Sequence, residues 1–114
     1  GGGSIVTLGG AKALSASPHR AHVAAAKHGL VGLTRTLARE FAEYGIRVNC
    51  VSPGPIDTSR PASRTDLKTP AKHIPAGRLG VPDDIAAMVH LLCTARGSFI
   101  TGQTLHVNGG MFMD

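Results

Sequence analysis

The sequence contains few aromatic residues, and this shortage restricts the kind of core it can form. Tryptophan is absent, tyrosine occurs once and phenylalanine three times among 114 residues. A core must therefore be built from aliphatic side chains, and the 42% of apolar residues suffice for one domain. No apolar stretch approaches the roughly 20 residues that a membrane-spanning helix needs, so we expect no membrane partner.

Cysteine is also scarce, and its positions indicate a reducing compartment. The two cysteines, Cys50 and Cys93, lie within apolar stretches. This favours buried free thiols over a disulfide, which nothing in the sequence supports. We therefore expect a soluble, cytoplasmic protein.

The excess of positive charge does not indicate a nucleic-acid partner. The net charge is +5, but the Lys and Arg residues are scattered from Lys12 to Arg96 without a basic run. None of the four aromatic residues lies beside a basic cluster, so we expect no nucleic-acid binding. His19 and His22 are three residues apart, but no Cys, Asp or Glu accompanies them at ligand spacing. We therefore expect no metal site.

The spacing of apolar residues predicts alternating strands and helices. Short β-branched runs over 4–8, 46–51 and 103–107 are typical of buried parallel strands. Between them, residues 19–44 and 82–94 have the periodicity of amphipathic helices. The first helix is expected to bury a stripe of apolar side chains and to end at Gly45. The residues of this stripe are Leu30, Leu33, Leu37 and Phe41.

This order of elements predicts an α/β fold with a partial Rossmann-like, doubly wound parallel sheet of about three strands and two long helices. We expect a single domain over 1–114, in which residues 56–79 form a long loop that acts as a substrate lid. A dinucleotide-binding fold needs a glycine-rich turn after its first strand, whereas Gly1 to Gly3 precede a strand. The chain is therefore expected to be the carboxyl-terminal half of such a fold.

Seven segments, in order along the chain, resemble the short-chain dehydrogenase/reductase family. Any one of them is a weak signal, but together they span nearly the whole sequence. The segments are residues 3–6, 26–30, 33–40, 45–49, 53–58, 84–86 and 100–110. The resemblance implies an oxidoreductase that depends on NADP or NAD and assembles as a homo-oligomer, either a dimer or a tetramer.

The resemblance also implies a catalytic trio, of which this sequence keeps one member. In the family a Tyr donates a proton to the substrate oxygen, and a Lys four residues later lowers the pKa of that phenol and holds the nicotinamide ribose. A Ser thirteen residues before the Tyr fixes the substrate carbonyl. Here Lys27 matches the Lys, but Val23 and Gly10 stand at the Tyr and Ser positions and cannot donate a proton. The only tyrosine, Tyr44, lies at the far end of the predicted helix.

The implied cofactor contacts continue in the turn after the second predicted strand. Pro53 and Gly54 lie just past the carboxyl end of that strand, where open α/β sheets bind ligands. Gly54 would allow close approach of the backbone. The resemblance implies that the backbone around Ile56 contacts the nicotinamide carboxamide, and that Thr58 contacts a cofactor phosphate or the amide. The alternative is a plain turn between a strand and a lid.

The loss of both hydroxyls leaves three interpretations open. Residues 22–27 resemble the 2,4-dienoyl-CoA reductase branch, which lacks the usual Tyr; this implies an acyl-thioester substrate of the enoyl-CoA, dienoyl-CoA or 3-oxoacyl class. Alternatively, the protein is a non-catalytic subunit of an oligomer, or the substitutions have no functional meaning. In any of these cases, we expect the isolated 114 residues to be inactive.

His22 is the only titratable side chain next to the vacated tyrosine position, and it could serve as an acid. However, it precedes Val23 by one residue and would point about 100° away on a helix. A capping, packing or solvent-facing role is therefore favoured.

Overall fold

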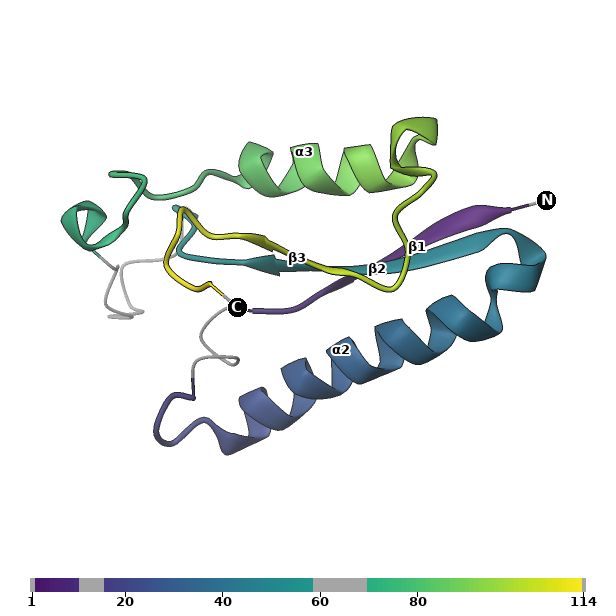
Figure 1. Cartoon of the computed structure of the whole chain (residues 1–114). Helices are drawn as coiled ribbons and strands as arrows, with labels where there is room; N and C mark the ends of the chain where they lie inside the picture. The colour runs from purple at the N-terminus through teal and green to yellow at the C-terminus, as the bar shows by residue number, and fades with distance from the viewer. Residues whose placement is uncertain (1, 11–15, 59–69, 114) are drawn as a thin grey trace.

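The computed structural model describes residues 2–10, 16–58 and 70–113. In this part of the chain, a parallel three-stranded sheet lies between two helices, one on each face (Figure 1). The strands are β1 (Gly3–Leu8), β2 (Ile46–Pro53) and β3 (Thr104–Val107), and the helices are α2 (Ala21–Glu40) and α3 (Pro82–Cys93). Short 3₁₀ turns are η1 (Ala42–Tyr44), η2 (Ala71–His73) and η3 (Ala95–Gly97). The predicted α/β fold is confirmed.

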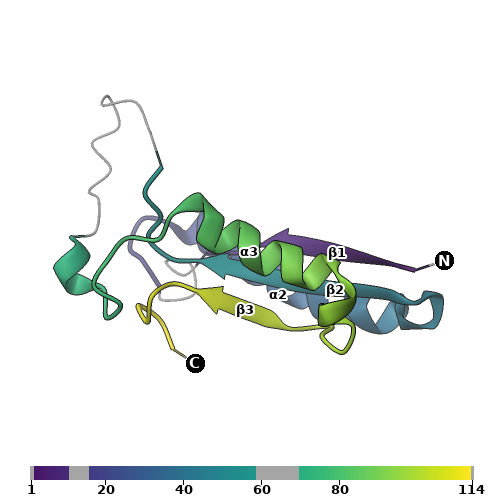
Figure 2. The same cartoon turned by 90° about the horizontal axis from the view of Figure 1, so that it is seen from above.

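The strand order is β1-β2-β3, with β2 in the centre (Figure 2). The register pairs Gly3 with Ile46 at one end of the β1–β2 ladder and Leu8 with Val51 at the other. β3 joins the second half of β2, from Cys50 onward. Because the strands are parallel, their carboxyl ends lie at one edge of the sheet, and the loops at that edge are available for a site.

Helix α2 packs on β1 and β2, although not with the whole of the predicted apolar stripe. Thr34 and Ala38 are its fully buried residues, and the Thr34 hydroxyl lies 2.8 Å from the hydroxyl of Thr7 on β1. The prediction for Leu33 was wrong, because its side chain is 48% exposed. A step of one residue on a helix turns a side chain by about 100°, so Leu33 is rotated off the face that carries Thr34.

The end of α2 agrees with the predicted breaker. The helix ends at Glu40, four residues before the predicted end, and tightens into η1. Gly45 then adopts the left-handed conformation, with φ of 69°, and its N–H donates to Ala42 O at 3.0 Å. Glycine reaches this conformation without steric penalty, so β2 can begin directly at Ile46.

Helix α3 covers the opposite face of the sheet and contains one of the two cysteines. Leu92 is fully buried there, and its carbonyl accepts a hydrogen bond from the Ser4 hydroxyl at 2.9 Å. Cys93 is exposed, so the prediction that both thiols are buried was correct only for Cys50. Cys93 follows Leu92 directly, and the rotation of one helical step carries it away from the sheet.

Residues 45–49, one of the seven segments that resemble the family, contain two polar side chains with a structural role. Arg47 Nη1 donates to Gly97 O at 2.7 Å and therefore holds the turn that follows α3. The buried Asn49 side chain donates to Ile100 O at 2.9 Å and accepts from the Gln103 N–H at 3.0 Å. These side chains fix the connection into β3. None of the described helices is both long enough and apolar enough to cross a membrane.

Candidate active site

The candidate site lies where β1 ends and the amino-terminal part of α2 passes the sheet. Lys27 is half-buried on α2, and its ammonium donates a hydrogen bond to Leu8 O, the last residue of β1, at 3.1 Å. Gly10 follows two residues later, and a Cβ built on it would lie 3.9 Å from Lys27 Cε. The structure therefore brings two of the three predicted catalytic positions together. Lys27 supplies a charge there, whereas Gly10 has no side chain where the family has a Ser.

The third position, Val23, is half-buried one helical turn before Lys27. The preceding residue, His22, is exposed, in agreement with its expected rotation away from the site. Tyr44 is 61% exposed and lies beyond the other end of α2, a helix of 20 residues and therefore about 30 Å long. Because neither Val23 nor Gly10 has a polar side-chain group, Lys27 supplies the only charge at these three positions.

The predicted cofactor turn begins at the end of β2, and Gly54 has a specific packing partner there. A Cβ built on Gly54 would lie 2.5 Å from Asn108 Cβ and 2.6 Å from Asn108 Cα. The Gly54 N–H donates to Val107 O at 2.9 Å. Glycine is therefore required for the close approach of this turn to the segment after β3, a reason that the sequence alone did not reveal.

The next residues of the turn pair with a distant glycine. Ile56 forms a parallel bridge with Gly80. The Asp57 N–H donates to Gly80 O at 2.8 Å, and the Gly80 N–H donates to Pro55 O at 2.9 Å. The predicted lid over 56–79 is thus anchored at both of its ends, while residues 59–69 lie outside the described residues and η2 lies in its second part.

Sequence analysis missed an ion pair beside this bridge. Arg78 binds Asp84 with two hydrogen bonds, from Nη1 to Oδ2 at 2.8 Å and from Nη2 to Oδ1 at 3.1 Å. Asp84 Oδ2 also accepts the Val81 N–H at 2.8 Å. The Arg78 guanidinium and then the Val81 N–H lower the pKa of Asp84 to about 2. The acidic first turn of α3 was visible in the sequence, but its partner six residues earlier has no recognisable spacing.

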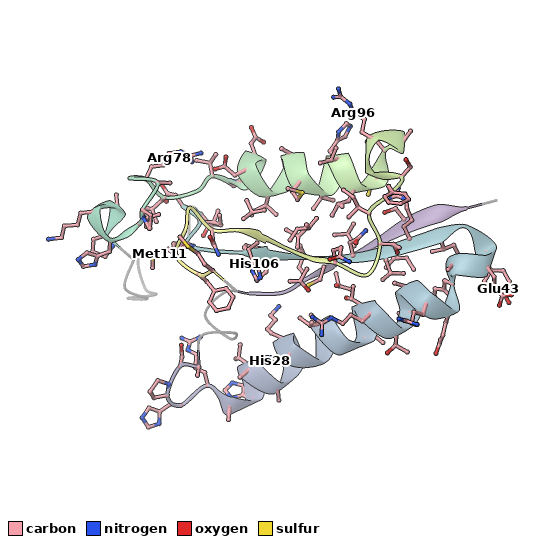
Figure 3. The ribbon with its side chains drawn as sticks, viewed as in Figure 1. His28, Glu43, Arg78, Arg96, His106 and Met111 are labelled. Atoms are coloured by element: carbon pink, nitrogen blue, oxygen red, sulfur yellow. The ribbon has the colours of Figure 1, made fainter. Side chains whose placement is uncertain are left out.

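Two hollows flank the turn, and Ile56 lines both of them. The first is a cavity of about 150 Å³ whose walls include Arg78 and Asp84. Figure 3 shows Arg78 close to the start of α3. The second is an open, largely apolar groove between the turn and α3. Its lining includes Pro53, Thr58, Ile85, Val89 and Cys93. Within residues 2–10, 16–58 and 70–113, no three His, Cys, Asp or Glu residues are placed to hold a metal ion.

A protein-family model described as enoyl-(acyl carrier protein) reductase matches residues 1–112 of this chain. Among curated proteins, the chain is 44% identical over 113 residues to 3-oxoacyl-(acyl-carrier-protein) reductase FabG of Salmonella typhimurium. It is 43% identical to the protein of the same name from Escherichia coli strain K12. Each match covers 97% of this chain and 46% of the relative, so the chain spans about half the length of these relatives.

Solved structures agree with these matches. A short-chain dehydrogenase/reductase described as glucose/ribitol dehydrogenase, from Brucella melitensis, superposes with a TM-score of 0.83 at 42% identity, covering 97% of this chain and 44% of that protein. Acetoin dehydrogenase YohF from Salmonella typhimurium also gives 0.83, at 38% identity, covering 96% of this chain and 43% of that one. The arrangement of three parallel strands and two helices is thus shared with solved dehydrogenases.

Proposed function

The chain belongs to the short-chain dehydrogenase/reductase family, and we propose that it forms the nicotinamide side of the active site in an NADP- or NAD-dependent oxidoreductase. The observation that carries the proposal is the position of Lys27. Its ammonium lies at the carboxyl end of β1, bonded to Leu8 O and beside Gly10. An ammonium has three N–H donors, so the bond to Leu8 does not exhaust its capacity for a ribose hydroxyl or a substrate oxygen.

The second part of the proposal concerns the cofactor turn. Pro53, Ile56 and Thr58 line the open apolar groove beside α3. A flat, weakly polar ring fits such a surface, with backbone groups near Ile56 available for its carboxamide and the Thr58 hydroxyl for a phosphate oxygen or the amide. A reduced nicotinamide bound there would supply a hydride. The adenine and pyrophosphate would be held by parts of the protein outside these 114 residues.

We propose an acyl thioester as the substrate, of the enoyl-CoA, dienoyl-CoA or 3-oxoacyl class. The family model and the curated relatives are both named for reductases of groups on acyl carrier protein. Addition of hydride to a conjugated thioester moves negative charge to the thioester oxygen, which the ammonium of Lys27 can stabilise. The enolate then takes a proton on carbon from water or from another donor, so reduction of an enoyl or dienoyl thioester does not need the hydroxyls absent at Gly10 and Val23. A 3-oxoacyl thioester would need a donor for its carbonyl oxygen as well.

A second candidate is a non-catalytic subunit that assembles with active copies of related chains. The same two positions favour it, because a ketone reductase without either hydroxyl lacks its proton donor. For the enzyme we expect a homo-oligomer, either a dimer or a tetramer, whereas the non-catalytic subunit would pair with a related chain. Under both proposals we expect a cytoplasmic protein.

The test uses the full-length protein that contains these residues. Oxidation of NADPH and NADH is followed with enoyl, dienoyl and 3-oxoacyl thioesters, and cofactor binding is measured by calorimetry. Replacing Lys27 by Met removes the charge at nearly constant length and should lower kcat/KM by about 10²-fold, the scale of one lost electrostatic contact. The matched control is Arg96→Met, which removes a positive charge at an exposed position on η3.

The outcomes separate the two candidates. Turnover of a thioester that is lost in Lys27→Met and kept in Arg96→Met supports the enzyme. A wild-type protein that binds cofactor but reduces none of the thioesters would favour the non-catalytic subunit. If Lys27→Met leaves both turnover and cofactor affinity intact, the assignment of Lys27 is wrong.

A further inference from the structure

An ion pair joins Arg78, in the loop before α3, to Asp84, in the first turn of that helix, and so closes a ring of seven residues. The guanidinium binds both carboxylate oxygens of Asp84 at 2.8 and 3.1 Å, and Nη1 also donates to Leu79 O at 3.0 Å. From the other side, Asp84 Oδ2 accepts the Val81 N–H at 2.8 Å. The planar guanidinium suits this two-pronged contact, which a lysine cannot reproduce. Arg78, before Gly80, and Val81, after it, are therefore both bonded to Asp84, which restrains the chain around Gly80.

Gly80 is the residue through which this ring meets the cofactor turn. It accepts from the Asp57 N–H and donates to Pro55 O, at 2.8 and 2.9 Å. A Cβ built on it would lie 2.5 Å from Ile56 Cδ1, the end of a side chain, and 3.5 Å from Pro55 O, so Gly80 packs directly against the turn. Between described residues, both backbone hydrogen bonds of the 55–57 segment go to Gly80.

Ile56 connects this contact to the proposed binding surface. Its side chain lines the small cavity that Arg78 and Asp84 also line, and it lines the groove that contains Thr58. On the strand side the turn is held by the hydrogen bond from Gly54 to Val107. The contact with Gly80 therefore helps to hold the residues beyond Gly54 in place.

We propose that Arg78 and Asp84 are positioning residues for the cofactor: they hold the Ile56–Thr58 segment in its binding position through the backbone bridge at Gly80. The proposal rests on the cofactor role of this turn. Neither side chain needs to touch the nicotinamide. Their contribution is to reduce the freedom of a turn that would otherwise have to be ordered when the cofactor binds.

The geometry allows this role to be separated from ordinary helix capping. Arg78→Ala removes the tie to Leu79 O and to the carboxylate but leaves the bond from the Val81 N–H to Asp84, which belongs to the start of α3. Arg78→Lys retains the charge without the fork and should recover part of the effect. The matched control is Asp83→Asn, an exposed acid in the same first turn of α3.

The first measurement is amide hydrogen exchange in the cofactor-free, full-length protein. In Arg78→Ala, peptides that contain Asp57 and Gly80 should exchange about two- to fivefold faster, the scale of one exposed ion pair. Peptides from the second half of α3 should be unchanged. Asp83→Asn should match the wild type throughout. Unchanged exchange at Asp57 and Gly80 in Arg78→Ala, or acceleration that extends through α3, would overturn the proposal.

The second measurement separates positioning from a purely structural role. The cofactor Kd and the cofactor KM of Arg78→Ala should rise by about the same two- to fivefold, because ordering of the turn is added to the cost of binding. The kcat should change little, and Arg78→Lys should give intermediate values. Faster exchange without loss of cofactor affinity would overturn the positioning role. A wild-type protein that binds no cofactor would overturn the proposed function and this role with it, whereas the exchange data would still report whether Arg78 holds the turn.

Discussion

Three neighbouring positions at the end of β1 and the start of α2 carry one charge and no hydroxyl. Lys27 is bonded to Leu8 O, Gly10 lies beside its side chain, and Val23 lies one helical turn before it. The hydroxyls that the family has at positions 10 and 23 are missing, but a side chain that carries one could be added if the backbone leaves room for it. Among the described residues, a Cβ built on Gly10 meets only Lys27 Cε, at the ordinary contact distance of 3.9 Å. A small side chain at Gly10 therefore fits against the described residues.

We predict that Gly10→Ser combined with Val23→Tyr, in the full-length protein, raises reduction of 3-oxoacyl thioesters. The two hydroxyls restore a carbonyl contact and a proton donor, and general acids contribute about 10²–10⁴-fold, so a gain of at least about tenfold is expected. Steady-state kinetics measure it, with each single variant as a control. If cofactor binding is normal but no 3-oxoacyl substrate is reduced, the backbone of the site has diverged as well.

At the scale of elements, some glycines lie at close contacts between two segments, and others lie where no neighbouring segment approaches. Gly54 lets the end of β2 meet the segment after β3, where an added Cβ would collide with Asn108, and Gly80 pairs with Ile56 of the same turn. By contrast, Gly32 lies inside α2, where an added Cβ would meet no described atom within 4 Å beyond the backbone of its own helix. The same residue type therefore has opposite energetic consequences at the two kinds of position.

We predict that Gly54→Ala destabilises the full-length protein by about 1–3 kcal/mol, the cost of forcing atoms into a packed site. Its matched control, Gly32→Ala, should stabilise the protein by up to about 1 kcal/mol, because alanine is the better helix former. Urea unfolding followed by circular dichroism measures both. Equal stability of the two variants would show that the contact between Gly54 and Asn108 is looser than the structure indicates.

At the scale of the molecule, the sheet formed by the described residues has an apolar edge. β1 pairs only with β2 in this part of the chain. Ile5 and Leu8 on that strand are 39% and 50% exposed, and Leu33 on α2 is exposed to a similar extent. An exposed apolar edge strand is a template for pairing with another chain. The open groove beside α3 adds further apolar surface.

We therefore predict that the isolated 114-residue polypeptide self-associates at tens of micromolar. Burial of an apolar side chain contributes roughly 1.5–3 kcal/mol, so several exposed ones cancel much of a typical domain stability of about 5–15 kcal/mol. Sedimentation velocity over a range of concentrations measures it. A monodisperse monomer of 11.7 kDa that unfolds cooperatively would contradict the prediction.

The sequence by itself determined the features that depend on local pattern. Periodicity placed three strands and two helices in the right order, and the left-handed preference of glycine placed the stop at Gly45. The family resemblance predicted one site from Gly10, Val23 and Lys27, and helix geometry agrees for the last two, because positions four apart on a helix lie on the same face. The roles of Lys27 and of the turn from Pro53 to Thr58 stay predictions until cofactor binding is measured.

Only the tertiary structure decided which side chains meet across long separations. Leu33 and Cys93 have apolar side chains of the kind found in cores, but both are rotated off the buried faces of their helices. The contact of Gly54 with Asn108, 54 residues away, has no signature in local sequence, and the pairing of Arg78 with Asp84 follows no recognisable spacing even though the two are near in the chain. The physical reason is that periodicity fixes the direction of a side chain relative to its own helix or strand. Its partner is fixed by how the elements pack.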